Sequence, residues 1–105
     1  RHVQEAFLGP FRRSRKARAL FAGHAHAYER FESGGRHFVV SGGGGGPRVR
    51  LLEGDRRRHE DLYRGPSPRP FHYLLLDSAG GAVRVRAKGF DSSGTPIRVF
   101  DEFAL

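Results

Sequence analysis

The chain has 105 residues, and its 19 Lys and Arg against 11 Asp and Glu give a formal net charge of +8. This length fits one domain or part of one, and the absence of cysteine excludes disulfides and thiolate metal sites. The apolar stretches are far shorter than the roughly 18 residues of a membrane-spanning helix, so the sequence predicts no membrane span.

The first sixteen residues predict a helix that ends or kinks near Leu8. An apolar stripe at a spacing of four residues is formed by Val3, Phe7 and Phe11. Gly9 and Pro10 interrupt this pattern, and a proline ends or bends a helix that reaches it. The basic run from Arg12 to Arg18 is expected to lie on a solvated surface, with phosphate binding as its alternative.

The stretch Ala17–Arg30, with the sequence ARALFAGHAHAYER, is the most informative part of the chain. Its apolar run Ala19–Ala22 stops at Gly23, which predicts a buried strand of a covered sheet. His24 and His26 follow at the strand end, where α/β folds place their chemistry. A neutral imidazole is a good ligand for Zn²⁺, Mn²⁺ or Fe. The pair therefore indicates a metal site, although single histidines are more often structural.

A second short strand is predicted over Arg36–Ser41, with His37 in a structural role at its start. Five glycines, Gly42–Gly46, follow and are closed by Pro47. Neither the Gly-Lys-Ser/Thr of a phosphate-binding P-loop nor the spacing of a dinucleotide fingerprint is present. A flexible linker is one interpretation of this segment.

Residues 48–70 contain few apolar side chains and many turn formers, so they predict a long surface excursion. Its anchors to the body are expected to be Leu51, Leu52, Leu62 and Tyr63. His59 is expected to be solvated there.

Three strands are predicted after this excursion, over Phe71–Asp77, Ala82–Lys88 and Ile97–Phe103. The first two are joined by a hairpin loop at residues 78–81, and His72 is expected to pack within the hairpin. In the second strand apolar and basic residues alternate, which predicts one buried and one wet face. The residues expected to face inward are Val83, Val85, Ala87, Ile97, Val99 and Phe103.

The segment GHAHAYER, Gly23–Arg30, resembles the last metal-ligand motif of the calcineurin-like metallophosphoesterases, and most closely that of their purple-acid-phosphatase-like branch. The likeness is specific over Ala19–Phe31 and is supported over Arg36–Pro47, where a strand and a glycine-rich loop follow. It implies that His24 and His26 each ligate one ion of a two-metal site that holds two divalent ions, or Fe with a divalent ion, from among Zn, Mn and Fe.

The residues that follow the pair are expected to have a supporting role. Glu29 or Arg30 would fix the loop by pairing with other groups, and Tyr28 would hydrogen-bond to a metal ligand, with direct contact to the substrate as the alternative. The resemblance also implies a role for the glycine loop. The glycines at Gly42, Gly43 and Gly44 would form a loop beside the metal pair, where the missing Cβ lets the backbone approach a ligand or a phosphate. This interpretation competes with the flexible linker.

The fold implied by the resemblance is a four-layer α/β/β/α sandwich, to which residues 1–105 would contribute a C-terminal portion of mainly antiparallel strands. Within it, residues 1–47 would carry the ligand motif and glycine loop, 48–70 the surface excursion and 71–105 the C-terminal strands. Three further ligand motifs of the family, Asp-x-His, Gly-Asp-x-x-Asp and Gly-Asn-His-Asp/Glu, do not occur, and the sequence contains no Met. We therefore expect a fragment that is inactive alone and needs the N-terminal part of the same domain.

The expected function is hydrolysis of a phosphoester by a dinuclear metal site in the intact parent enzyme. The sequence does not determine the compartment, although the resemblance allows an extracytoplasmic one. Two alternatives come from other classes of protein: a basic nucleic-acid-binding module, suggested by the net charge, and a non-catalytic β-rich interaction domain. Aromatic residues among the basic runs are few, so nucleic acid is the weaker expectation for a partner.

Overall fold

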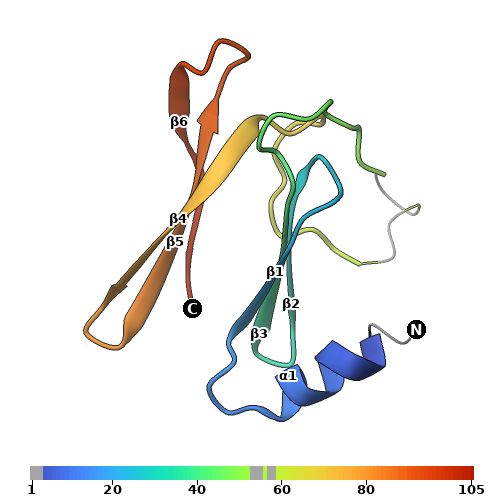
Figure 1. Cartoon of the computed structure of the whole chain (residues 1–105), viewed down its shortest axis with the longest axis vertical. Coiled ribbons are helices and arrows are strands. Elements are labelled where there is room, and N and C mark those ends of the chain that lie inside the picture. Colours follow the sequence, from blue (N-terminus) through green and yellow to red (C-terminus); the bar gives the residue numbers. More distant parts are fainter. Residues whose placement is uncertain (1–3, 53–55, 57–58) are drawn as a thin grey trace.

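The structure, a computed structural model, describes residues 4–52, 56 and 59–105. Figure 1 shows two small β-sheets and a short helical segment near one end of the first sheet. The elements are the π-helical turn η1 (Gln4–Leu8), the helix α1 (Gly9–Arg13) and the strands β1 (Ala19–Ala22), β2 (Tyr28–Ser33), β3 (Arg36–Ser41), β4 (Phe71–Ala79), β5 (Ala82–Phe90) and β6 (Pro96–Ala104). The chain is thus α/β with mostly antiparallel sheets and few helices. Within the described ranges, we find no helix that is long and apolar enough to span a membrane.

The helical segment was predicted to end or kink near Leu8, and at that residue the π-helical turn η1 gives way to the helix α1 rather than to a loop. Leu8 precedes α1, and Pro10 lies in the first turn of that helix. A proline is well tolerated there because its missing N–H would have no partner within the helix. Phe11 packs edge-on against Phe38 of β3 with 5.4 Å between ring centroids, whereas Phe7 is 64% exposed. Val3, the first member of the predicted stripe, lies outside the described residues.

The first sheet has the strand order β1–β3–β2, so β3 is its centre. β1 pairs with β3 in parallel, and β2 pairs with β3 as an antiparallel hairpin. The two strands predicted here, 19–22 and 36–41, are confirmed. The predicted burial of β1 is not, because Phe21 is 39% exposed and no described element covers that side of the strand.

The second sheet is an antiparallel meander of order β4–β5–β6. Gly80 and Gly81 form the tip of the first hairpin with φ of 59° and 80°, which confirms the predicted turn. In β5, Val85 and Ala87 are fully buried while Arg84 on the opposite face is exposed, as the alternation predicts.

The prediction for β6 is wrong in one part. Ile97 and Val99 are 56% and 41% exposed, whereas Phe103 is 9% exposed. The register of β5 and β6 shifts at two places. Ala87 pairs with Asp101 but Lys88 pairs with Val99, so Phe100 is an extra residue in β6, and an extra residue reverses the faces of the strand beyond it. Ile97 lies in the second irregularity, between the pairs Lys88–Val99 and Phe90–Pro96.

The two sheets pack against each other through one small core. Its buried members are Tyr28, Val39, Tyr63, Val85, Ala87 and Phe103. Tyr63 comes from the excursion between β3 and β4 and is one of its predicted anchors. Leu62 and Leu52, predicted as anchors too, are 38% and 58% exposed. Figure 1 shows the excursion running beside the upper end of the first sheet, where the chain passes to β4.

Candidate metal centre

The loop that carries both predicted ligands crosses over the end of the central strand. β1 and β2 flank β3 on opposite sides, and β1 ends at the edge where β2 begins. Gly23–Ala27 must therefore pass over the C-terminal end of β3, and the N–H of Gly42 donates to the carbonyl of Ala27 over 3.0 Å. The sheet topology thus places His24 and His26 at the carboxyl end of two parallel strands, the usual location of α/β sites.

Each of the two histidines is the middle residue of a three-residue turn. The N–H of Ala25 donates to the carbonyl of Gly23 at 3.0 Å, and that of Ala27 to the carbonyl of Ala25 at 2.8 Å. His24 has a φ of 74°, the only positive value at a non-glycine residue in the described chain. A γ-turn with positive φ is rare and strained, and such strain is concentrated at functional sites.

The ring of His26 is held in one tautomer by a backbone carbonyl. Its Nδ1 lies 2.8 Å from the carbonyl oxygen of Pro47. Because a carbonyl can only accept, Nδ1 carries the proton and Nε2 keeps its lone pair. Metal-bound histidines are usually held in this way, with one ring nitrogen donating to a carbonyl or a carboxylate and the other on the metal.

The glycine loop packs directly on the histidine loop at two positions. A Cβ at Gly42 would lie 2.0 Å from the carbonyl oxygen of Ala25, and one at Gly46 would lie 2.5 Å from Cε1 of His26. At Gly43 a Cβ would lie 2.3 Å from the ring of His72, whereas at Gly44 nothing lies within 4 Å. Of the three predicted loop glycines, Gly42 thus lies against the histidine loop, Gly43 lies against His72, and Gly44 is exposed.

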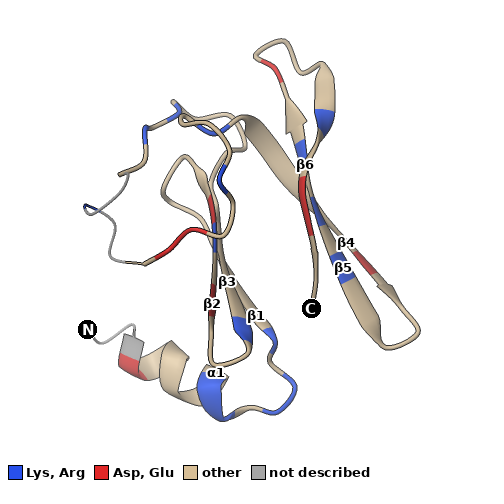
Figure 2. Cartoon of the chain, turned by 180° about the vertical axis from the view of Figure 1, so that it is seen from behind, with Lys and Arg blue, Asp and Glu red and all other residues tan. Residues whose placement is uncertain are grey.

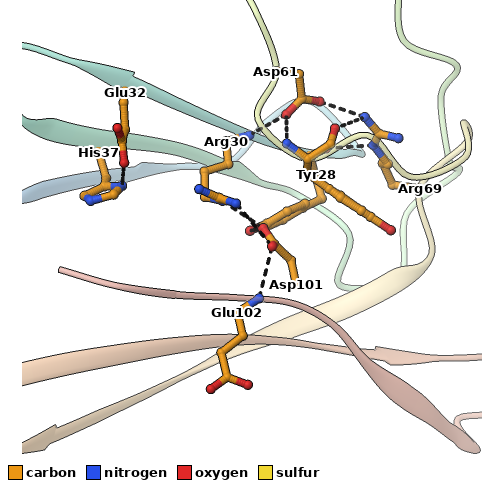
Figure 3. A network of polar contacts seen from close by, with 9 residues as sticks. Tyr28, Arg30, Glu32, His37, Asp61, Arg69, Asp101 and Glu102 are labelled. Atoms are coloured by element: carbon orange, nitrogen blue, oxygen red, sulfur yellow. Dashed lines mark hydrogen bonds and ion pairs between the residues drawn. The ribbon is translucent and has the colours of Figure 1, made fainter.

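Tyr28 and Arg30, predicted to support the ligands, instead share a carboxylate from β6. The hydroxyl of Tyr28 donates to Oδ2 of Asp101 at 2.6 Å, and Nε of Arg30 donates to the same oxygen at 2.9 Å (Figure 3). Burial, reinforced by the Asp101 carboxylate, raises the pKa of Tyr28 far above its usual range, so the phenol stays a donor. The contact joins the two sheets just below the histidine loop.

A second carboxylate, Asp61, ties the excursion to β2. Its Oδ1 accepts from the N–H of Arg30 at 3.0 Å and its Oδ2 from Nη2 of Arg69 at 2.7 Å, with both side chains of the ion pair 5% exposed (Figure 3). Arg69 also donates to four carbonyls, those of Tyr28, Tyr63, Gly65 and Pro66. All five guanidinium N–H groups are therefore satisfied, which a buried arginine requires.

His72 links the end of β3 to the start of β4. Its Nδ1 donates to the carbonyl of Pro70 at 2.9 Å, and its Nε2 accepts from the hydroxyl of Ser41 at 2.9 Å. Burial lowers the pKa of His72, against a smaller opposing effect of the Pro70 hydrogen bond. Both ring nitrogens are used, so His72 has no lone pair for a metal.

Two more of the described histidines, His37 and His59, lie away from the pair. His37 stacks on Phe103 at 5.2 Å and lies 3.4 Å from Glu32, while His59 is exposed and touches Phe31 with its ring. Within residues 4–52, 56 and 59–105 no cluster of three or more His, Cys, Asp or Glu could hold a metal ion. A metal bound by His24 and His26 would have two ligands from the described residues, and a stable site needs more.

Sequence reasoning missed Asp61, Arg69 and Asp101 altogether. Asp61 and Arg69 belong to a segment that the composition assigned to solvent, yet both are buried. Asp101 faces inward from β6 beside Phe103, an alternation visible in the sequence as an acidic residue two positions from an aromatic one.

Comparisons with protein-family models, with curated proteins and with solved structures found no match to this chain.

Proposed function

We propose that this chain supplies two histidine ligands, His24 and His26, to a dinuclear metal site that hydrolyses phosphoesters. The observation that supports it best is the hydrogen bond from Nδ1 of His26 to the Pro47 carbonyl, because it leaves Nε2 with a lone pair. The strained backbone at His24 supports it as well, since a φ of 74° is unfavourable for histidine without a compensating role.

The chain's own residues would bind and orient the ions. When two ions are bound, they supply Lewis acidity for the phosphate oxygens and a water of lowered pKa as nucleophile. His24 and His26 would ligate one ion each, and the close approach of Gly42 and Gly46 would fix the loop that carries them. Imidazole binds a metal only when it is neutral, so affinity should fall as the pH drops.

The remaining ligands would come from residues outside these 105, in the N-terminal part of a four-layer sandwich. The amount of exposed surface supports this part of the proposal. A monomer of 11.7 kDa normally exposes about 5,900 Å², whereas this chain exposes 7475 Å². Its radius of gyration is 14.4 Å, against about 13 Å for a compact domain of this length. The difference of about 1,600 Å² is about twice the roughly 800 Å² that one partner contributes to a standard protein interface.

The proposal is tested in the natural protein that contains this segment. Its hydrolysis of p-nitrophenyl phosphate should require added or retained metal and should fall by about 100-fold or more in His24→Ala and His26→Ala, since groups that merely support a ligand already contribute about 10- to 100-fold. His59→Gln is the matched control, because His59 is exposed and distant in sequence from the loop. Full activity in both alanine variants would refute the assignment.

Nucleic-acid binding is the alternative that the same protein can test. Figure 2 shows basic segments spread over α1, the strands and the excursion, with acidic segments between several of them. A nucleic-acid surface predicts binding that weakens steeply with salt and does not depend on the two histidines.

A further inference from the structure

A pocket on the other side of the Pro47 segment has the composition of an anion site. It lies between the excursion and β6. Its lining includes two arginines and a tyrosine, together with prolines and an aromatic ring: Arg48, Tyr63, Pro66, Pro68, Arg98 and Phe100. Arg48 lies between two residues that contact His26. The carbonyl of Pro47 accepts from Nδ1 of His26, and the N–H of Val49 donates to the carbonyl of His26 at 3.3 Å. Residues 47–49 therefore connect the pocket, through Arg48, to the loop that carries His26.

Arg48 and Arg98 are the two basic residues that line this pocket. Neither Arg48 nor Arg98 forms an ion pair with any carboxylate in the described part of the chain. Arg48 is nevertheless held in place, with its guanidinium 4.8 Å from the centre of the Phe71 ring. Arg98 lies on the same side of β6 as Phe100, the residue that the β-bulge adds, and bulges often re-aim side chains beside functional sites.

Tyr63 also lines this pocket. Tyr63 is 8% exposed, and its hydroxyl exchanges no hydrogen bond with any residue that the structure describes. Burial raises the pKa of Tyr63, against the opposing effect of Arg69 and Arg98, so the hydroxyl keeps its proton and can donate. Two basic residues and one tyrosine thus line a hollow whose remaining walls are three prolines, Gly89, Ile97 and the ring of Phe100.

These walls favour a flat ring over a small inorganic ion. Pro66, Pro68 and the ring of Phe100 offer apolar surface, and aromatic groups gain from such contact beyond their charge. Ligand sites typically combine a mainly apolar lining with a few convergent polar groups that fix the orientation.

We propose that this pocket binds the leaving-group half of the substrate, an aromatic ring that carries an anionic group of its own. The inference rests on the proposed phosphoesterase function for its connection to the metal centre, but the pocket itself does not depend on the metal. Binding of this half would position the phosphoester at the histidine loop.

The first test measures binding in the natural protein after metal removal by a chelator, with 4-hydroxybenzoate as the probe and calorimetry as the readout. Arg48→Gln and Arg98→Gln should each weaken binding about tenfold, as expected for loss of a charge-assisted contact. Tyr63→Phe should weaken it less, and inorganic phosphate should bind more weakly than the probe. Arg84→Gln is the matched control, since Arg84 is exposed and pairs with Glu102 on the sheet surface.

The outcomes separate this proposal from the function that it builds on. His24→Ala and His26→Ala should leave probe binding to the metal-free protein unchanged, whatever they do to hydrolysis. Equal affinity in Arg48→Gln, Arg98→Gln and Arg84→Gln would overturn the pocket. In the metal-loaded enzyme Arg98→Gln should raise KM for 4-carboxyphenyl phosphate about tenfold and leave KM for methyl phosphate unchanged. Equal KM values for the carboxylated substrate in Arg98→Gln and the parent would show that the pocket does not take the leaving group.

Discussion

At the scale of single residues, His24 is the position where backbone and side chain have opposite requirements. Its φ of 74° belongs to the left-handed region that glycine occupies without strain. A histidine there is less stable than a glycine. Strain of this kind persists mostly where the side chain has a role that glycine cannot fill. The strain is therefore an argument for function that does not depend on the resemblance of the motif.

His24→Gly should stabilise the protein and abolish metal binding at once. Relief of the left-handed strain is expected to raise the free energy of unfolding by about 1 kcal/mol, measured by chemical denaturation without metal. At His26, where no positive φ occurs, the same change to glycine should not stabilise. A loss of stability in His24→Gly would mean that the turn is not strained.

The buried pair of Asp61 and Arg69 gives a second prediction at this scale. Asp61→Ala should cost about 3–5 kcal/mol of folding free energy, because it leaves a buried guanidinium without its carboxylate. Glu60→Ala, next to it in sequence, removes a pair whose side chains are 68% and 79% exposed and should cost less than about 1 kcal/mol. Similar unfolding free energies for the two variants would contradict the burial of Asp61.

At the scale of elements, the crossing loop and the glycine loop form one unit at the end of β3. Gly42→Ala would put a Cβ 2.0 Å from the Ala25 carbonyl, so the histidine loop must shift. We expect a loss of about 1–3 kcal/mol in stability, the usual cost of overpacking, together with weaker metal binding. Gly44→Ala, with nothing within 4 Å of its Cβ, should change neither. Calorimetric melts and metal titration of both variants decide whether the glycines are a linker or a packed loop.

The junction between β3 and β4 should make stability depend on pH through His72. Its pKa is lowered in the folded protein, so the unfolded chain binds a proton more readily. The stability that the buried neutral His72 contributes is therefore fully present above about pH 6.5, the ordinary pKa of histidine. It is lost as the pH falls from there through the folded-state pKa. Melting temperatures of the parent and His72→Gln, measured between pH 7.5 and 5, should show a smaller slope in the variant. Equal slopes would contradict the buried neutral imidazole.

Five of the six described strands were predicted from the sequence, because their apolar runs are short and bounded by turn residues. Residues 19–22, 36–41 and 82–88 fold as expected, and the tip of the β4–β5 hairpin is at the predicted glycines. The strand β2 (Tyr28–Ser33) was missed, because its charged residues interrupt any apolar run. The faces of β6 were predicted wrongly near Ile97 and Val99, because two register shifts lie there and no local pattern predicts them.

At the scale of the whole molecule, a site built from distant segments could be predicted only in part. The histidine pair is contiguous and visible in the sequence, as is the glycine loop that follows it. The carboxylate of Asp101 reaches Tyr28 across 73 residues, and contacts at such separation depend on how the two sheets pack. The exposed area of 7475 Å² is larger than that of a compact domain of this size. This openness of the two sheets depends on their packing and could not be predicted from the sequence either.

The central claim is that His24 and His26 each hold one of two metal ions. The most direct test is the number of bound ions per chain, measured by elemental analysis of the natural protein purified without chelator. We expect two ions in the parent and in His59→Gln, and a loss toward one ion in each of His24→Ala and His26→Ala. Two ions retained in both alanine variants would contradict the claim.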